Sequence, residues 1–246
     1  CLNLKSRNER LENYKRAYLS DKENSLSPFD VKKFISNEIL INKYKFDKNK
    51  KNADVLLHHF TDQSRMRLQY TWYESFLDWF LETIEYCSLN KNINWFFKPH
   101  PIEKYYPIDI HIQKSILDKI KNNNFLYINP ENNLSHEDLA QFASVLVTCN
   151  GTCKIEYPTL FNIPVISCIS DYLVYDSSIY SHTAKTNSEY KKLILNAHKL
   201  TLSSKDIDLY KVGFLAYKNV LEASINDQFE LKELIDKKGN KVFRNF

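Results

Sequence analysis

Short apolar runs alternate with longer amphipathic segments along most of this chain. The apolar runs have the length of buried strands and lie at 54–58, 94–98, 125–128, 144–148 and 164–167. The segments between them show helical spacing of apolar positions, at 70–89, 110–122, 136–142, 153–161 and 188–199, with a last long helix at 204–224. Strands that alternate with helices favour a parallel sheet. We therefore expect an α/β fold in which a parallel, Rossmann-like sheet is flanked by helices.

The pattern divides the chain into three segments. Residues 1–52 are polar and rich in Lys and Asn, and they predict a helical lead-in. Residues 53–228 hold the regular alternation and form the predicted Rossmann-like domain. The closing segment, 229–246, is charged with scattered aromatics and is expected to be a tail. An aromatic stripe between Tyr70 and Phe80 has helical spacing, so we assign it to core packing.

Charge and length exclude several classes of protein. The 246 residues include 34 basic and 30 acidic ones, scattered along the chain, so the net charge of +4 predicts no nucleic-acid partner. No apolar run approaches the roughly 18 residues that span a bilayer, which leaves peripheral contact as the only expected membrane association. Five cysteines, three of them in or beside apolar runs, predict reduced thiols in a cytoplasmic protein. Because the chain begins with Cys1 rather than Met, we expect a fragment of a longer protein.

The strand predicted at 94–98 ends in Lys98-Pro99-His100-Pro101. Each proline fixes φ and lacks an N–H, so neither a strand nor a helix can continue through this segment. Lys98 and His100 are thereby left at the carboxyl end of a strand, the edge where open α/β sheets bind ligands. A cation and an imidazole together suit a phosphate or diphosphate. A rigid corner with an exposed lysine and a packed histidine is the alternative.

The strand predicted at 144–148 ends in Asn150-Gly151-Thr152, and a helical segment follows. Backbone N–H groups at the start of a helix favour an anion. The chain has only three glycines, so Gly151 at this junction indicates a position that tolerates no Cβ. Glu156 follows one helical turn later, where its carboxylate could accept hydrogen bonds from ribose or sugar hydroxyls. A solvated helix residue is the alternative for Glu156.

The first predicted strand ends in a segment dense in acids, bases and hydroxyl groups. His58 and His59 are neighbours, so alternation turns one of them inward and leaves the other for chemistry. We favour His59 as a general acid or base, together with Asp62. Ser64 is a candidate ligand for a sugar or ribose hydroxyl. Asp62 and Ser64 could equally cap the helix that follows.

Several catalytic signatures are missing from the sequence. It contains no Walker phosphate loop, G-x-G-x-x-G, H-E-x-x-H or nucleophile elbow, which argues against a kinase, a Rossmann dehydrogenase and a serine hydrolase. Cys149 and Cys153 have no second Cys or His pair at the spacing of a zinc site. We therefore predict neither a metal site nor a cofactor.

Four stretches together resemble a known family. They are Leu56 to Ser64, Asn94 to Pro101, Ala143 to Thr152 with Glu156 and Asn162 to Ile166, and Thr186 to Leu193. With their K-P-H-P and N-G-T elements, these stretches resemble the bacterial glycosyltransferases that synthesise capsule and surface polysaccharides. The resemblance is specifically to the donor-binding C-terminal half of the GT-B type, and it covers roughly residues 53–200.

The resemblance implies transfer of a sugar from a CMP-, UDP- or GDP-linked donor to a glycan or lipid-linked acceptor of a bacterial capsule or lipooligosaccharide. The residues that the resemblance implies for the donor phosphate are His100, Asn150, Gly151 and Thr152. The pattern of the sequence itself adds Lys98 for the phosphate and Glu156 and Ser64 for the donor sugar or ribose. The phosphate-binding groups would stabilise the charge on the leaving phosphate in place of a metal ion. Residues 1–52 would be a remnant of an acceptor domain whose main part lies outside this chain.

Two other functions fit the same pattern. Polyol-phosphate transferases of the glycerophosphate type show a comparable Pro-His-Pro strand end. A non-catalytic nucleotide- or glycan-binding module of a larger capsule-assembly protein would need only the binding site. For each of the three functions we expect a cytoplasmic protein, with peripheral contact at the inner face of the cytoplasmic membrane as the form of membrane association.

Overall fold

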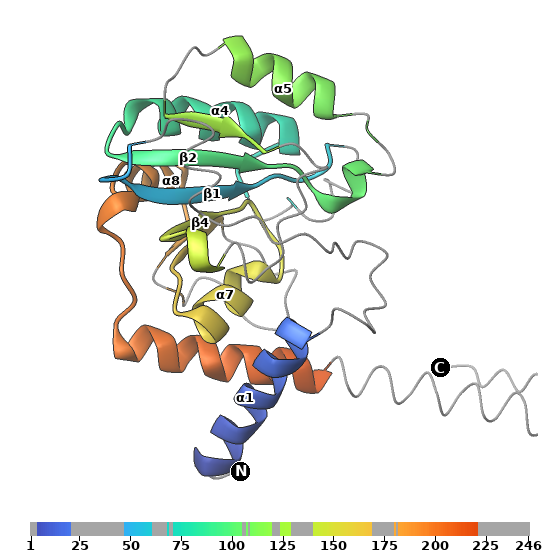
Figure 1. Cartoon of the computed structure of the whole chain (residues 1–246), viewed down its shortest axis with the longest axis vertical. Coiled ribbons are helices and arrows are strands. Elements are labelled where there is room, and N and C mark those ends of the chain that lie inside the picture. The colour runs from blue at the N-terminus through green and yellow to red at the C-terminus, as the bar shows by residue number, and fades with distance from the viewer. Residues whose placement is uncertain are drawn as a thin grey trace, which may run out of the picture.

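The computed structural model describes residues 4–20, 47–60, 68, 71–104, 107, 109–119, 124–128, 140–168, 180 and 182–220. Within them, β1 (Lys51–Leu56), β2 (Ile93–Lys98), β3 (Phe125–Tyr127), β4 (Val145–Val147), β5 (Val165–Cys168) and β6 (Thr183–Ala184) form one sheet. The order is β3-β2-β1-β4-β5-β6, and each neighbouring pair is parallel. The chain moves outward from β1 to β3 and then returns to β4, so its direction reverses between β1 and β4. The predicted α/β, Rossmann-like fold is confirmed (Figure 1).

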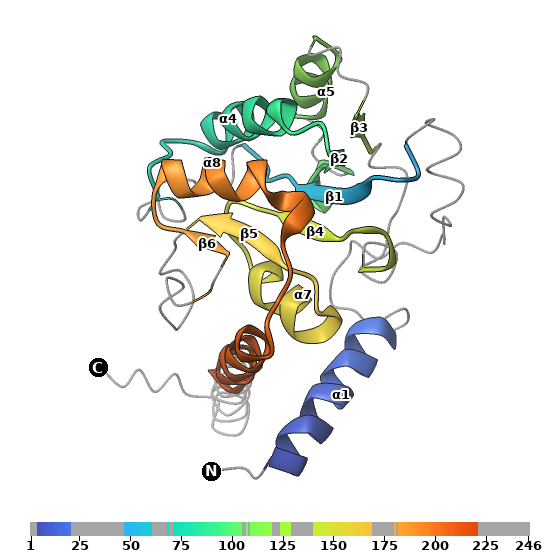
Figure 2. The same cartoon turned by 90° about the vertical axis from the view of Figure 1, so that its left-hand side faces the viewer.

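Helices cover both faces of the sheet. They are α1 (Leu4–Ser20), α4 (Phe76–Leu89), α5 (Ile110–Lys119), α7 (Cys153–Phe161) and α8 (Asn187–Leu195), with a further helix over 204–220 and 3-10 turns at Pro101–Lys104 and Ala197–Lys199. In Figure 2, α4 and α8 lie on one side of the sheet and α7 lies on the other. None of the described helices combines the length and the apolar character that crossing a bilayer requires.

Side-chain alternation along the strands divides the core between these two faces. Phe97 of β2 belongs to a buried cluster with Trp79 of α4 and Ile194 of α8. Its neighbour Phe96 points the other way and packs with Tyr157 of α7. Because both faces are covered, the central strands are apolar on both sides, which explains why they read as nearly continuous apolar runs.

The predicted helical lead-in is confirmed over α1, which packs against the helix at 204–220 (Figure 2). Leu11 shares a buried cluster with Phe214. The Tyr14 ring meets the Phe214 ring edge-on, with centroids 5.7 Å apart. Gly213 permits a close approach of Tyr180, because a Cβ at this position would lie 1.9 Å from the tyrosine oxygen. These contacts belong to a third buried cluster, which also includes Ile155 and Leu160 of α7.

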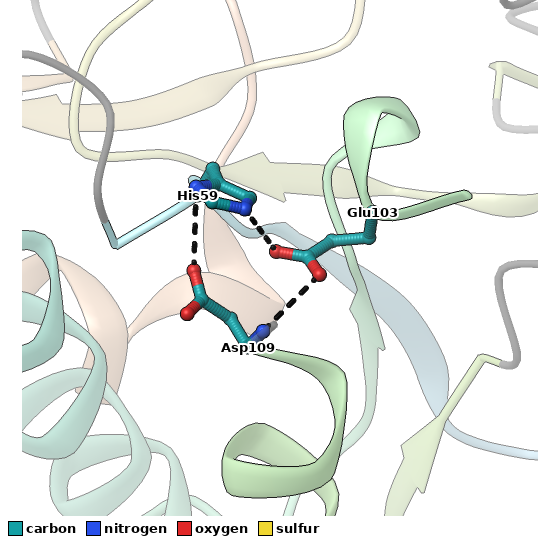
Figure 3. A group of neighbouring side chains, drawn as sticks. All are labelled: His59, Glu103 and Asp109. Atoms are coloured by element: carbon teal, nitrogen blue, oxygen red, sulfur yellow. Dashed lines mark hydrogen bonds and ion pairs between the residues drawn. The ribbon is translucent and has the colours of Figure 1, made fainter. Parts of the chain in front are cut away.

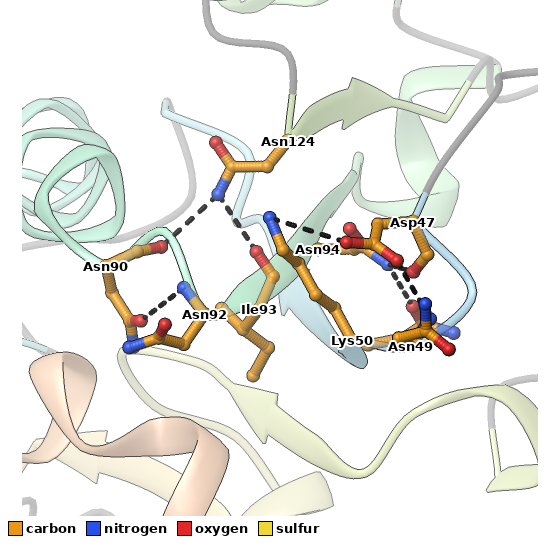
Figure 4. A network of polar contacts seen from close by, with 9 residues as sticks. Asp47, Asn49, Lys50, Asn90, Asn92, Ile93, Asn94 and Asn124 are labelled. Carbon is orange, nitrogen blue, oxygen red and sulfur yellow. Dashed lines mark hydrogen bonds and ion pairs between the residues drawn. The ribbon is translucent and has the colours of Figure 1, made fainter.

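Asparagine side chains hold the amino edge of the sheet (Figure 4). Asn94 Nδ2 donates to the Asp47 carbonyl oxygen at 3.0 Å and to Asn52 Oδ1 at 2.9 Å. Asn124 Nδ2 donates to the carbonyl oxygens of Asn90 and Ile93, at 3.2 and 2.9 Å. The amides satisfy backbone acceptors where the strands begin, so we assign this edge a structural role.

Two element boundaries differ from the prediction. β1 begins at Lys51, three residues before the predicted first strand and before the expected start of the Rossmann-like domain. The helix predicted at 70–89 begins only at Phe76. Ser75 caps it, because its hydroxyl oxygen accepts the Asp78 N–H at 3.1 Å. The core assignment of the aromatic stripe is confirmed for its helical part, since Phe76, Trp79 and Phe80 are fully buried.

The C-terminal part of the fold also differs in detail. The helix predicted at 188–199 divides into α8 and a 3-10 turn, and its N-cap is Thr186. The short β6 was not predicted at all. The tail predicted at 229–246 lies outside the described residues, as do 21–46 and most of the helix predicted at 136–142.

Candidate functional site

Polar side chains gather at the carboxyl edge of the sheet, around the reversal between β1 and β4. His58 and His59 follow β1, Lys98 ends β2, and Thr148 follows β4. The Leu57 N–H donates to the Lys98 carbonyl oxygen at 2.8 Å, which keeps the ends of β1 and β2 side by side. Doubly wound sheets bind their ligands at this edge.

His58 is a packed side chain. Its ring stacks on Phe76 with centroids 4.2 Å apart and meets Trp79 edge-on at 5.6 Å. Its Nε2 lies 3.1 Å from Thr148 Oγ1 and 3.3 Å from the backbone nitrogen of Asn150. His58 therefore fastens the segment after β4 to the end of β1. Both neighbouring histidines are buried, at 8% exposed for His58 and 6% for His59, so the prediction that only one of them is packed inward is wrong.

Asn150 and Gly151 build the turn that leads into α7. Asn150 is buried; its Oδ1 accepts the Gly151 N–H at 2.7 Å, and its carbonyl oxygen accepts the Thr148 hydroxyl at 2.8 Å. Gly151 has a φ of +127°, which L side chains rarely adopt, while a Cβ there would meet Cys153 Sγ only at 3.7 Å. Gly151 is therefore required for its backbone conformation rather than for space.

α7 begins at this edge without a side-chain cap. Its N-cap residue, Thr152, has helical backbone angles of φ −67° and ψ −25°, and the hydroxyl makes no capping hydrogen bond. In α4 and α8, by contrast, Ser75 and Thr186 accept a backbone N–H of the first turn. The N–H groups of Lys154, Ile155 and Glu156 already donate to the carbonyl oxygens of Gly151 and Thr152, so the start of α7 offers an anion chiefly the positive end of the helix dipole. The start of α7 is therefore suited to an anion.

Lys98 lies on the face of the sheet toward α7. Burial lowers the pKa of Lys98, and electrostatic interactions with Asp54 and Cys153 oppose this shift. Asp54 is fully buried in β1, and neither of its carboxylate oxygens has a hydrogen-bond partner among the described residues. Burial raises the pKa of Asp54 to about 8, against the opposing effect of Lys98. At neutral pH the Asp54 carboxyl group is therefore mostly protonated and leaves the charge of Lys98 largely uncompensated.

Cys153 and Glu156 occupy the first turn of α7. Cys153 lies close enough to both Lys98 and Glu156 for the two residues of each pair to influence each other's pKa. Burial raises the pKa of Cys153 to about 12; Glu156 adds to the shift and a hydrogen bond with the Thr148 side chain opposes it. The Glu156 side chain is only 8% exposed, which contradicts its alternative interpretation as a solvated helix residue.

His100 is half-buried in the turn that follows β2. Its Nδ1 accepts the Ile102 N–H at 3.2 Å, so we assign the proton of the neutral ring to Nε2. The Nε2–H group is a donor of the kind that an anion requires. The Glu103 N–H donates to the His100 carbonyl oxygen at 3.0 Å, which closes the 3-10 turn behind it.

His59 lies between two buried carboxylates (Figure 3). His59 Nε2 is 3.4 Å from Glu103 Oε1, and His59 Nδ1 is 3.5 Å from Asp109 Oδ2. The side chains come from the end of β1, the turn Pro101–Lys104 and the start of α5, and their residues are 6%, 0% and 2% exposed. Burial raises the pKa of Glu103, and His59 opposes this shift.

The structure joins some of the predicted site residues and separates others. Lys98 and Glu156 both interact with Cys153, whereas His59 belongs to a separate cluster with two acids that the sequence did not single out. Asp62 and Ser64 lie outside the described residues. Asp54 was missed as well, although a charged residue inside an apolar run is itself a signal.

No protein-family model matches the chain, and no curated protein matches it either. The chemistry of the site is therefore argued from its own groups. The carboxyl edge combines a lysine, an imidazole N–H donor and an uncapped helix start. Groups of each of these kinds bind phosphate oxygens in proteins.

Proposed function

We propose that this chain binds a nucleotide-sugar and acts as a glycosyltransferase, or as the donor-binding domain of one. The observation that carries the proposal is the position of Lys98, at the end of β2, and of the start of α7 on the same carboxyl edge of a doubly wound sheet. Both features supply positive potential to the same place. The K-P-H-P and N-G-T motifs resemble those of capsule glycosyltransferases, which gives the class of donor: a CMP-, UDP- or GDP-linked sugar.

The proposed mechanism assigns the leaving nucleotide to these groups. When the glycosidic bond of the donor breaks, negative charge develops on the nucleotide phosphate. Lys98, the His100 Nε2–H and the positive end of the α7 helix dipole would stabilise that charge more strongly in the transition state than in the ground state. Burial lowers the pKa of Lys98, and because Asp54 is mostly protonated at neutral pH, a phosphate would be the partner that favours the charged form of the lysine.

Glu156 supports the proposal from the first turn of α7, where its carboxylate can accept hydrogen bonds from ribose or sugar hydroxyls. The acceptor in this proposal is a glycan or lipid-linked glycan of a bacterial capsule or lipooligosaccharide. The location that follows is the cytoplasm, with peripheral contact at the inner face of the membrane. The acceptor domain would be supplied by a part of the protein outside this chain.

A nucleotide-binding module without transferase activity is the second candidate. The observation that favours it is the burial of His59, which is 6% exposed and has a carboxylate beside each ring nitrogen. A general base for an acceptor hydroxyl must be able to reach that hydroxyl. The two candidates share the phosphate site and differ only in turnover.

The phosphate site is tested by the melting temperature of the purified chain with CMP, CDP, UDP and GDP. A ligand at 100 times its dissociation constant stabilises the native state by about 2.7 kcal/mol, so a bound nucleotide should raise the melting temperature by several degrees. Lys98→Gln should abolish most of this increase, whereas Lys91→Gln, at an exposed position before β2, should leave it unchanged. An equal increase in both variants would exclude Lys98 from the site.

A hydrolysis assay with the corresponding sugar nucleotides separates the two candidates. A transferase is expected to release free sugar slowly in the absence of acceptor, and Lys98→Gln should reduce that rate by one or more orders of magnitude. Binding of nucleotide without any release of sugar would favour the non-catalytic module.

A further inference from the structure

We propose that His59, Glu103 and Asp109 form a binding site for a divalent transition-metal cation, with Zn²⁺ as the ion best suited to the ligands. This site would add a metal to a chain whose sequence predicts none. The inference depends only on the geometry of these three side chains and is independent of nucleotide binding.

The ligand atoms have the spacing of a coordination sphere. One atom from each side chain can be chosen so that all three lie within 4.8 Å of one another. Ligands at 2.0–2.2 Å from a tetrahedral zinc ion are about 3.4 Å apart. The His59 Nε2 to Glu103 Oε1 distance is already 3.4 Å, whereas Asp109 Oδ2 lies beside the other ring nitrogen, so binding one ion requires the imidazole or the Asp109 side chain to turn until both carboxylates face the same nitrogen.

The contacts between His59 and the two carboxylates are longer than charge-assisted hydrogen bonds. A hydrogen bond between an imidazolium and a carboxylate is typically about 2.7–2.9 Å long. The two contacts of His59 are 3.4 and 3.5 Å, so both ring nitrogens lie farther from their carboxylates than such bonds allow. Glu103 Oε1 has no hydrogen-bond partner within the part of the chain that the structure describes, and it points at the imidazole.

Charge favours a cation as well. Glu103 and Asp109 are 0% and 2% exposed, and burying two ionised carboxylates together costs several kcal/mol per group unless positive charge compensates them. A protonated His59 supplies one positive charge against two negative ones. A divalent ion balances both carboxylates and leaves His59 neutral, the form in which imidazole binds a metal. One nitrogen ligand with two carboxylates suits zinc and its neighbours better than magnesium or calcium.

Backbone groups already orient the two carboxylates. Asp109 Oδ2 accepts the Phe60 N–H, and Glu103 Oε2 accepts the Asp109 N–H at 3.3 Å. The Gln113 N–H donates to the Asp109 carbonyl oxygen at 2.8 Å at the start of α5. The Asp109 carboxylate is therefore fixed by a donor outside the three-residue set and the Glu103 carboxylate by the backbone of Asp109, as backbone and outer contacts fix the ligands of metal sites.

A cation here would connect three segments. It would join the end of β1, the turn Pro101–Lys104 and the start of α5, and the same turn carries His100 through the bond from the Glu103 N–H. Metal binding and the sequence-based role of His59 as an acid or base exclude each other, because a metal-bound nitrogen has no lone pair for a proton. The experiment below therefore also decides between these two roles of His59.

The test measures metal binding by the whole chain. The protein is stripped with EDTA, dialysed and titrated with Zn²⁺, and bound metal is measured by atomic emission. We expect one equivalent of Zn²⁺, a raised melting temperature, and visible d–d absorption when Co²⁺ replaces Zn²⁺. Glu103→Gln and, separately, Asp109→Asn should weaken Zn²⁺ binding 10-fold or more, while the control Glu85→Gln, on the exposed side of α4, should not.

The wild-type titration decides even if a variant fails to fold. If the stripped wild-type protein binds no Zn²⁺ and gives no Co²⁺ absorption while remaining folded, the metal site is overturned. Imidazole NMR shifts showing that His59 stays protonated at neutral pH in the presence of Zn²⁺ would overturn the site too. They would identify a network of ion pairs instead. Binding that Glu103→Gln leaves as tight as in the wild type would place the metal elsewhere and reject this site.

Discussion

The two faces of the sheet differ in what they bury. On the side of α4 and α8, the strands pack against aromatic rings, and the central polar atoms are paired: Trp79 Nε1–H donates to the Tyr190 hydroxyl oxygen at 2.9 Å, and Thr83 Oγ1 lies 2.9 Å from the same oxygen. The Tyr73 hydroxyl and Glu82 Oε2 on this side have no hydrogen-bond partner among the described residues. On the side of α7, the same strands place Asp54 and Lys98. The sequence alternates between these faces residue by residue.

The difference shows how one sheet separates stability from binding. The α4/α8 face gains free energy from the burial of aromatic rings and from the hydrogen bonds of Trp79 and Thr83 with Tyr190. The α7 face contains a carboxyl group without a hydrogen-bond partner among the described residues, which lowers stability whenever that group is ionised. We infer that the unfavourable groups persist on the α7 face because they serve the ligand site at its carboxyl edge.

The largest expected effect is that of Asp54→Asn on the pH dependence of stability. The folded pKa of Asp54 is raised from its ordinary value of 3.8 to about 8, so the folded state holds a proton that the unfolded state has lost. The contribution of Asp54 protonation to the free energy of unfolding is fully present below about pH 4. It decreases by about 1.4 kcal/mol per pH unit as the pH rises toward 8. Asp54→Asn removes the titration, so the variant should exceed the wild type in stability at pH 8 by several kcal/mol.

Urea unfolding at pH 5, 6, 7 and 8 measures this difference. The advantage of Asp54→Asn should shrink steadily toward pH 5, and Asp118→Asn, at an exposed position of α5, should show no such trend. A constant difference between wild type and Asp54→Asn across the four pH values would mean that Asp54 titrates normally. The contrast between the two faces would then lose its main support.

A smaller effect is expected for Tyr190→Phe on the other face. The substitution keeps the ring but removes the hydroxyl group that pairs with Trp79 Nε1 and Thr83 Oγ1, and it leaves both atoms buried. The expected loss is about 1–3 kcal/mol in the free energy of unfolding. The loss should be the same at pH 5 and pH 8, because no group in this cluster changes charge in that range. Tyr217→Phe, at a half-buried position, should cost less.

The fold was predictable from the sequence because burial on both faces makes each central strand a short apolar run. The runs at 94–98 and 164–167 coincide with β2 and β5 to within a residue or two. Ends of elements were less predictable, since they depend on which residue caps a helix. Ser75 accepts the Asp78 N–H and starts α4 well after the apolar spacing begins, whereas β6 is too short to leave a pattern.

The candidate site was predictable only where a local motif marks it. The prolines around His100 and the glycine at 151 indicate positions with an unusual backbone conformation. The structure confirms this for Gly151, which has a positive φ. The contacts of His59 with Glu103 and Asp109 join residues more than forty positions apart, so only the folded chain brings them together. Asp54 could have been noticed, because an acid in the middle of a buried strand must pair, lose its charge or serve a ligand.

The smallest expected effects on the free energy of unfolding are those of substitutions at the starts of α7 and α8. They compare the two faces of the sheet directly. Thr186 accepts the Glu189 N–H at 3.2 Å on the α8 side, so Thr186→Ala should cost about 1 kcal/mol of stability. Thr152 makes no capping bond on the α7 side, so Thr152→Ala should cost close to nothing in urea unfolding yet reduce the nucleotide-induced rise in melting temperature. Both changes remove a threonine hydroxyl at the start of a helix, but Thr186 has the extended backbone of an N-cap and Thr152 has helical angles, so the pair tests whether the hydroxyl at each start acts as a cap. Equal losses of stability in the two variants would show that α7 is capped like α8, and the start of α7 would then be an ordinary helix terminus rather than an anion site.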